Sequence, residues 1–250
     1  MIQVLLCGCH GKMGKIISEL IAERNDLRIV AGVDRIQEAE PPQFPVFQAI
    51  AEVNVASDVL IDFSHHSLVP AVLDYVAQTK IPAVICTTGL DAPLAARIAA
   101  VARIAPILRS GNMSLGINLL LDLVKRAASV LGDGFDLEII EKHHNRKVDA
   151  PSGTAYMLAE AANQALGNKK TYVYGREGKD AKRQKEEIGI HAIRGGTIVG
   201  EHTVIFAGTD EVIEIHHSAA SRRVFGAGAL KAALFLVHQT PGLYTMKDVL

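Results

Sequence analysis

Residues 2–14 read IQVLLCGCHGKMG, and this stretch decides the fold. Its apolar start predicts a strand, and the periodicity of the residues that follow it predicts a helix. Between the two, Gly8, Gly11 and Gly14 have the spacing GxxGxxG, a variant of the dinucleotide fingerprint GxGxxG. Such glycines let the backbone approach a pyrophosphate, whose charge then lies at the helix N-terminus. An ordinary tight turn between a strand and a helix would account for the same glycines.

The next predicted strand, at 27–33, ends at Asp34 and Arg35. A carboxylate at this place accepts hydrogen bonds from the adenosine ribose, so Asp34 supports nucleotide binding. Asp34 favours NAD because a carboxylate repels a 2′-phosphate, whereas Arg35 could hold the phosphate of NADP. Since Arg35 is equally acceptable as a solvated surface residue, the sequence leaves dual specificity open.

Short apolar runs alternate with helical patterns through the first part of the chain. Strands are also predicted at 59–64 and 82–88, and helices at 15–23, 69–78 and 94–105. This alternation predicts an α/β fold with a Rossmann-type, doubly wound parallel sheet. In such sheets ligands bind beyond the carboxyl ends of the strands.

The pattern changes after residue 113. Helices are predicted at 115–131 and from Ser152 to Gly167, a strand at 136–141 and an exposed polar loop at 176–187. Three further strands, at 188–194, 196–207 and 211–219, are separated by Gly-Gly and Thr-Asp turns, which predict antiparallel hairpins. We therefore predict a first domain at 1–113, joined by a returning helix and tail at 225–250, and an α+β domain with a mixed or antiparallel sheet at 114–224.

The composition argues against nucleic-acid-binding, membrane and secreted proteins. The 250 residues carry a formal net charge of −1, which argues against a nucleic-acid partner. No apolar run approaches the roughly 18 residues of a membrane span, and the first residues do not resemble a secretory signal. The three cysteines include no C-x-x-C pair and indicate reduced thiols. These features predict a cytoplasmic protein.

Residues 141–155, EKHHNRKVDAPSGTA, combine titratable side chains with a helix start. A metal site is disfavoured because adjacent histidines diverge and no further ligand set accompanies them. A solvated basic face remains an alternative. The helix start offers backbone N–H groups and the Ser152 and Thr154 hydroxyls to an anion. With the cations beside it, the segment is typical of a site for a small dicarboxylate, and a histidine there could deliver a proton after hydride transfer from a nicotinamide.

At this point residues 138–155, EIIEKHHNRKVDAPSGTA, resemble the signature of the dihydrodipicolinate reductase family. The resemblance covers nearly the whole chain. It continues in GCHGKMG at 8–14, IDFS at 61–64, CTTG at 86–89, GNMSLGIN at 111–118, YGREG at 174–178, RGGTIVGEHTV at 194–204 and GLYTMKDVL at 242–250.

The resemblance implies a reductase of the diaminopimelate and lysine pathway. It implies that NADPH or NADH reduces the dehydrated form of 4-hydroxy-tetrahydrodipicolinate, a small cyclic dicarboxylate, at ring C4. It also implies a homotetramer, so that residues 114–224 would serve both substrate binding and oligomerisation. By position, His143 is implied as the acid/base residue, Lys147 as a second proton donor, and His144 with the Gly153 and Thr154 amides as substrate contacts.

Nucleotide contacts are implied for four segments, and no metal is implied. The residues are Gly8, Cys9, His10, Gly11, Lys12 and Met13; Asp34 and Arg35; Cys86, Thr87 and Thr88; and Ser110, Gly111, Asn112 and Met113. Three of these depart from the family pattern. Cys86 stands where glycine is common, Lys12 where arginine is common, and Met113 where an aromatic residue is common. The departures leave the preference between NADH and NADPH open.

Two rival functions fit part of this pattern. Another two-domain Rossmann dehydrogenase would explain the glycine loop but not the segment at 141–155. A protein that senses NAD(P) would need no proton donor. Four histidines and two arginines outside the segment admit both cofactor and structural roles: His65, His66, His216, His217, Arg222 and Arg223.

Overall fold

The computed structural model describes residues 1–35 and 42–250. Its contacts divide the chain into two compact units. The first comprises Met1–Leu115 and Arg222–Leu250, and the second comprises Gly116–Ser221. Each unit has a hydrophobic core of its own.

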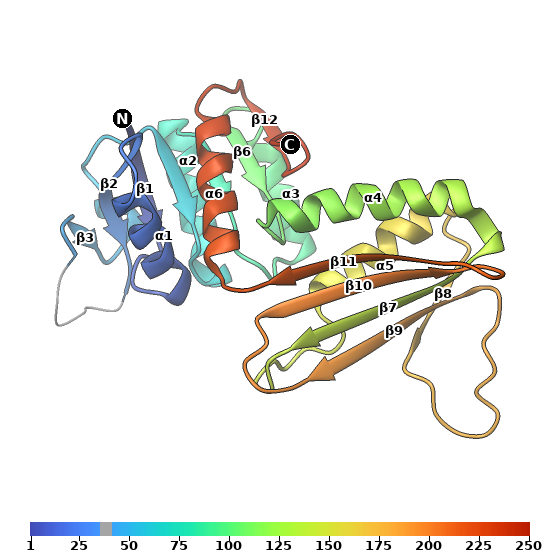
Figure 1. Cartoon of the computed structure of the whole chain (residues 1–250). Coiled ribbons are helices and arrows are strands. Elements are labelled where there is room, and N and C mark those ends of the chain that lie inside the picture. Colours follow the sequence, from blue (N-terminus) through green and yellow to red (C-terminus); the bar gives the residue numbers. More distant parts are fainter. Residues whose placement is uncertain (36–41) are drawn as a thin grey trace. The chain divides into compact units, whose positions relative to one another are not determined.

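A seven-stranded sheet forms the centre of the first unit (Figure 1). In the order β12-β6-β5-β4-β1-β2-β3, every neighbouring pair is parallel. The strands are β1 (Ile2–Cys7), β2 (Leu27–Val33), β3 (Val46–Phe47), β4 (Val59–Asp62), β5 (Ala83–Ile85), β6 (Pro106–Arg109) and β12 (Gly242–Tyr244). The Rossmann-type prediction is confirmed. The short strands β3, β6 and β12 were not predicted.

Helices cover both faces of this sheet, because the strands bury apolar side chains on each side. α1 (Lys12–Ala22) and α6 (Arg223–Leu236) pack on one face, where Ile17 and Leu230 lie in the same core. α2 (Val69–Thr79) and α3 (Ala92–Val101) contribute to the core on the other face. Two short 3₁₀ helices, η1 (Ile50–Glu52) and η2 (His66–Leu68), lie in the connections.

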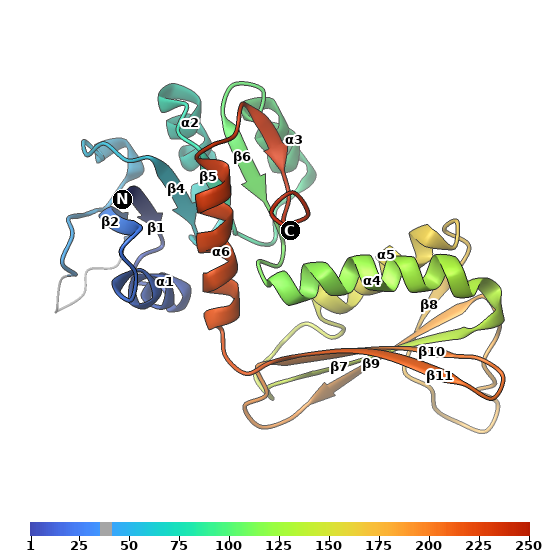
Figure 2. The same cartoon turned by 45° about the horizontal axis from the view of Figure 1, so that its top comes forward.

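The second unit has a mixed five-stranded sheet with one face covered by helices (Figure 2). Its order is β11-β10-β7-β9-β8. The elements are α4 (Leu115–Leu131), η3 (Gly132–Gly134), β7 (Asp136–His143), α5 (Gly153–Ala165), β8 (Thr171–Tyr174), β9 (Glu187–Arg194), β10 (Gly200–Ala207) and β11 (Val212–Ala219). Alternate residues of β7 and β10, among them Leu137, Ile139 and Val204, pack with the helices in one core.

One of the two predicted hairpins is wrong. β10 and β11 pair antiparallel as expected, but β9 does not pair with β10, because β7 lies between them. The Gly195 N–H donates to the His143 carbonyl at 2.9 Å, so the Gly-Gly segment passes over the end of β7. β9 instead lies parallel to β7 and β8, and its consecutive buried residues 188–190 are typical of an interior parallel strand. A glycine pair specifies a turn but not the neighbouring strand.

The predicted polar loop is confirmed over 176–186, and Glu187 begins β9. Two of its arginines, Arg176 and Arg183, form ion pairs with Glu138 on β7, which hold the loop against the sheet. β8 precedes this loop and was not predicted. Within residues 1–35 and 42–250, no helix has both the length and the apolar character that a membrane span requires.

Candidate functional site

The glycine loop between β1 and α1 has a backbone that other residues would distort. Gly8 has φ +79°, and a Cβ there would lie 2.7 Å from the Phe63 carbonyl oxygen. A Cβ at Gly14 would overlap the carbonyl oxygens of Gly8 and Cys9. Gly11 is the N-cap of α1 and contributes no side-chain cap. The helix therefore begins with backbone N–H groups at the carboxyl end of the sheet, where an anion binds well.

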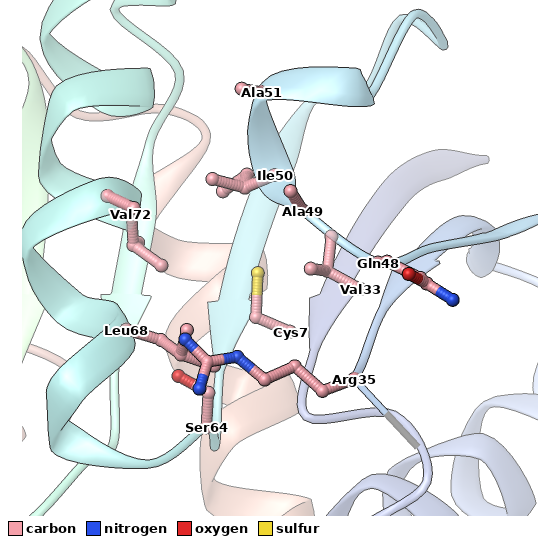
Figure 3. Close-up of a pocket in the computed structure, with 11 residues that line it drawn as sticks. Cys7, Val33, Arg35, Gln48, Ala49, Ile50, Ala51, Ser64, Leu68 and Val72 are labelled. Atoms are coloured by element: carbon pink, nitrogen blue, oxygen red, sulfur yellow. The ribbon is translucent and has the colours of Figure 1, made fainter. Parts of the chain in front are cut away.

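Asp34 fixes this loop from the neighbouring strand. Its Oδ2 accepts a hydrogen bond from the His10 N–H at 3.0 Å. Arg35 follows and extends across a pocket of about 220 Å³ toward Ser64 and Leu68 (Figure 3). The pocket is lined mainly by apolar side chains from the ends of β1 and β2, from residues 49–51 at η1, and from η2 and α2. The apolar walls of the pocket suit a planar base, and its one guanidinium suits a phosphate on the attached ribose.

The segments at 86–88 and 110–113 follow β5 and β6, so they lie at the same end of the sheet as the glycine loop. The Thr87 hydroxyl donates to Asp62 at 2.7 Å and is buried, whereas Thr88 is exposed. Burial raises the pKa of Asp62, against hydrogen bonds from Ser64 and Thr87 that lower it.

Side-chain to backbone hydrogen bonds shape the second segment. The Ser110 hydroxyl donates to the Asn112 carbonyl at 2.7 Å. Met113, which stands where an aromatic residue is common, is buried in the core and packs there. The carboxyl end of the sheet thus brings the four predicted nucleotide segments together, and the glycine loop and the pocket beside Arg35 fit a dinucleotide.

The second unit has a polar cluster on the helix-covered face of its sheet. Along β7 this face passes from Leu137 and Ile139, which are core residues, to Glu141 and His143. His202 of β10 pairs in register with Glu141, and Arg194 of β9 with His143. The apolar face therefore ends in titratable groups near the carboxyl end of β7.

Glu141 is the centre of this cluster and has no exposed surface. Its Oε2 accepts from His143 Nδ1 at 2.6 Å and from Arg194 at 2.7 Å, and its Oε1 accepts from Arg194 at 2.7 Å and from the Ser152 N–H at 2.9 Å. Burial raises the pKa of this carboxyl, but hydrogen bonds from His143, Arg194 and Ser152 outweigh it and lower the pKa to about 2. Glu141 is therefore a carboxylate at neutral pH.

His202 is the second buried titratable group, at 4% exposure. Its Nε2 lies 3.0 Å from the Ser152 hydroxyl oxygen, and its ring meets the His143 ring edge-on at a centroid distance of 5.2 Å. Burial, followed by the charge of His143, lowers the pKa of His202 to about 4. His202 is therefore neutral at pH 7.

The segment between β7 and α5 brings the predicted substrate residues together. His143 ends β7 and His144 follows it, both partly buried. Lys147 Nζ lies 2.7 Å and 2.9 Å from the two Asp149 carboxylate oxygens. Burial raises the pKa of Asp149, but the hydrogen bond and charge of Lys147, with a backbone hydrogen bond and the charge of Arg194, lower it overall.

The helix start is built as the sequence predicts. Ser152 is the N-cap of α5, and its hydroxyl accepts from the Ala155 N–H at 3.1 Å. Gly153 is exposed and Thr154 is partly buried on the first turn. A cationic loop therefore adjoins a helix N-terminus within one unit.

Two family models match the chain. The model for the dihydrodipicolinate reductase N-terminus matches residues 2–113, and the model for its C-terminus matches residues 116–250. A 4-hydroxy-tetrahydrodipicolinate reductase from Caldanaerobacter subterraneus is 56% identical over 249 residues, which are 100% of this chain and 98% of the relative. The enzyme of that name from Clostridium botulinum is 48% identical over 251 residues, with the same coverage of 100% and 98%.

The chain belongs to the dihydrodipicolinate reductase family. It is an oxidoreductase of a family that acts in the lysine and diaminopimelate pathway. The first unit is the NAD(P)-binding Rossmann domain of that family, which uses NADH or NADPH.

Solved structures support the fold. A dipicolinate-bound dihydrodipicolinate reductase from Paenisporosarcina sp. TG-14 has a TM-score of 0.82 at 22% identity and covers 99% of this chain and 98% of its own. A myo-inositol dehydrogenase from Corynebacterium glutamicum has a TM-score of 0.61 at 14% identity, covering 100% and 92%. The architecture is thus shared with other dehydrogenases.

Sequence reasoning missed Glu141, Arg194 and His202 as parts of the polar cluster in the second unit. One signal was available for Glu141, which shares a strand face with Leu137 and Ile139 and is therefore a buried acid that needs partners. Arg194 and His202 lie on other strands, so only the sheet order brings them to it.

Three of the remaining histidines and arginines make local contacts. His65 caps η2 by accepting from the Ser67 N–H, and His216 Nδ1 lies 2.8 Å from the Thr203 hydroxyl on the opposite sheet face from His202. Arg223 at the start of α6 forms a 2.6 Å ion pair with Glu23. These contacts favour structural roles for the three residues.

Proposed function

We propose that this chain reduces the dehydrated form of 4-hydroxy-tetrahydrodipicolinate to tetrahydrodipicolinate, with NADPH or NADH. The observation that carries the proposal is the position of His143, held by a buried carboxylate immediately before the loop that leads into α5. Reduction of a cyclic dicarboxylate requires a proton donor and a site for each carboxylate. An imidazole, a lysine and a helix N-terminus are groups that can provide them.

One substrate carboxylate would bind at the start of α5. The Gly153 and Thr154 N–H groups lie in the first turn, where backbone donors and the helix dipole both favour an anion. His144 would contact the substrate from the loop. The dipicolinate in the Paenisporosarcina structure is a dicarboxylate, which supports this class of ligand.

His143 would transfer the proton as the acid/base residue. Its Nδ1 is occupied by Glu141, so Nε2 is the atom that can exchange a proton with substrate. Lys147 would act as the second proton donor, and its positive charge would stabilise the anion that forms when ring C4 accepts a hydride. Asp149 would release Lys147 as the substrate carboxylates approach, because an exposed ion pair is weak.

The bound nucleotide would supply the hydride. The loop at 8–13 would hold its pyrophosphate, Asp34 and Arg35 its adenosine ribose, and the segments at 86–88 and 110–113 its nicotinamide end. The glycine contacts, the 3.0 Å hydrogen bond from His10 to Asp34 and the pocket beside Arg35 support these assignments.

A cytoplasmic homotetramer is the assembly we propose. The sheet face of the second unit opposite α4 and α5 includes exposed apolar side chains, among them Ile193 and Val212. Edge strands and apolar sheet faces need covering, which other subunits would provide. Sedimentation velocity would measure the assembly, and consumption of NADPH or NADH in the presence of freshly generated substrate tests the activity.

A further inference from the structure

We propose that Glu141 and Arg194 form a positioning pair, which fixes the imidazole of His143 with its proton on Nδ1 and its Nε2 available for the reaction. This inference rests on the proposed role of His143. It assigns a role to two residues that do not themselves contact the substrate in the proposed function.

The first step concerns the proton on the ring. Glu141 is fully buried and ionised, so its oxygens can only accept hydrogen bonds. The 2.6 Å contact to His143 therefore requires a proton on Nδ1. The hydrogen bond made by one ring nitrogen determines the state of the other, so neutral His143 has a lone pair on Nε2 and protonated His143 has its transferable proton there.

The second step concerns the orientation of the carboxylate. Arg194 binds both oxygens of Glu141 at 2.7 Å, a bidentate geometry that fixes the plane of the carboxylate. The same arginine donates to the Asp149 carbonyl at 2.6 Å. The pair therefore connects β7, β9 and the loop that contains Lys147. Glu141 contacts His143 directly, and Arg194 contacts the backbone of Asp149, whose side chain pairs with Lys147.

A structural role alone would not require this arrangement. A buried ion pair contributes little net stability compared with apolar residues of similar size, because both charges must be desolvated. Glu141 also uses its fourth hydrogen bond on the Ser152 N–H, at the N-cap of α5. The pair thus contacts three parts of the proposed substrate site: the His143 ring, the loop that contains Lys147, and the N-cap of α5.

The chain offers a matched control in Glu138. This residue lies on the same strand but on the opposite face, and it also accepts from a histidine and from arginines. Its contacts are 2.7 Å to His191 Nε2, 2.9 Å to Arg183 Nε and 3.2 Å to Arg176. Glu138→Gln removes the same charge from a similar network outside the proposed site.

The test compares Glu141→Gln, Arg194→Lys and Glu138→Gln in the full-length protein. We expect Glu141→Gln to lower kcat by about 100-fold or more, since the amide no longer enforces one tautomer. Arg194→Lys loses the bidentate contact and should lower kcat about tenfold or more. Nucleotide Kd should stay within about twofold for both, and Glu138→Gln should retain kcat within about twofold.

The decisive readout is the ¹⁵N NMR signature of the His143 ring in ligand-free protein, at a pH where the ring is neutral. Wild-type protein should show the Nδ1–H tautomer, and Glu141→Gln should shift the population toward Nε2–H. A wild-type Nε2–H tautomer would overturn the inference even if Glu141→Gln failed to fold. Equal losses of kcat in Glu141→Gln and Glu138→Gln would also overturn it. Absence of wild-type turnover would instead contradict the proposed function.

Discussion

Nδ1 of His143 lies 2.6 Å from Oε2 of Glu141, and the two residues are separated by one position on the same face of β7. Because side chains two apart on a strand point to the same side, the strand itself brings the imidazole to the carboxylate. The carboxylate is buried, so its interaction with the ring is weakly screened by solvent. This dyad links the fold of the second unit to the chemistry that we propose.

Gly200→Ala should impair the dyad by crowding. A Cβ at Gly200 would lie 3.1 Å from His143 Nε2 and 3.4 Å from its Cδ2, so the ring would have to move by a few tenths of an ångström. We expect kcat to fall about tenfold with nucleotide Kd unchanged. Gly134→Ala is the control, since a Cβ there meets nothing within 4 Å. Wild-type kcat in Gly200→Ala would show that His143 needs no fixed position.

His143→Ala and Lys147→Ala should separate chemistry from nucleotide binding. Each removes a proposed proton donor, so kcat should fall by about 10²- to 10⁴-fold. Nucleotide Kd, measured by fluorescence or calorimetry, should change little, because both residues belong to the second unit and the nucleotide segments to the first. Parallel losses of kcat and nucleotide affinity would argue against these roles.

Arg35→Ala should change the nucleotide preference. The guanidinium extends across the pocket that Val33 and Arg35 line (Figure 3). A cation there can offset the repulsion between the carboxylate of the preceding residue, Asp34, and a 2′-phosphate. We expect affinity for NADPH to fall about tenfold or more and affinity for NADH to change by less than threefold. The exposed Arg97, paired with Asp74 on α2, gives the control Arg97→Ala. Equal losses for both nucleotides would place Arg35 away from the 2′-phosphate.

His202 should make the stability of the protein depend on pH. Its pKa falls from an ordinary value near 6.5 to about 4 in the folded protein, through burial first and then the charge of His143. Between these values the unfolded chain binds more protons, so stability is complete above about pH 6.5 and is lost as the pH falls toward 4. The loss is of the order of 3 kcal/mol, which should lower the unfolding temperature by several degrees.

Thermal unfolding of wild-type protein and His202→Gln at pH 7, 5.5 and 4.5 measures this effect. The variant should lose less stability on acidification than wild type. The contribution of Glu141 does not interfere, since its pKa is lowered to about 2 and its stabilisation is lost only below about pH 4.5. If the unfolding temperatures of wild type and His202→Gln fell equally with pH, His202 would not titrate in this range.

Much of the fold could be predicted from the sequence where a pattern is local. The helix at 115–131 and the cap at Ser152 follow from apolar periodicity and side-chain chemistry, and the structure has both. The pairing of a strand with its neighbour in a sheet, in contrast, depends on residues far apart in the sequence. Residues 195–199, which begin with Gly195 and Gly196, join β9 to β10, yet β7 lies between the two strands. β9 has the consecutive buried residues of an interior parallel strand.

The same limit applies to the site. The loop with His143 and Lys147 could be predicted, because its residues are consecutive and adjoin a helix start. Arg194 is 53 residues from Glu141 along the chain, so no spacing indicates their contact. The neutral state of His202 depends on its burial beside Ser152, which only the packed sheet establishes.

Turnover by the wild-type protein is the most direct test of the proposed function. A coupled reaction would generate 4-hydroxy-tetrahydrodipicolinate in the cuvette, and the loss of absorbance of the reduced nicotinamide would follow consumption of NADPH or NADH. We predict consumption of at least one nucleotide that depends on both substrate and enzyme. No consumption of either nucleotide, with the substrate shown to be present and the protein folded, would contradict the proposed function.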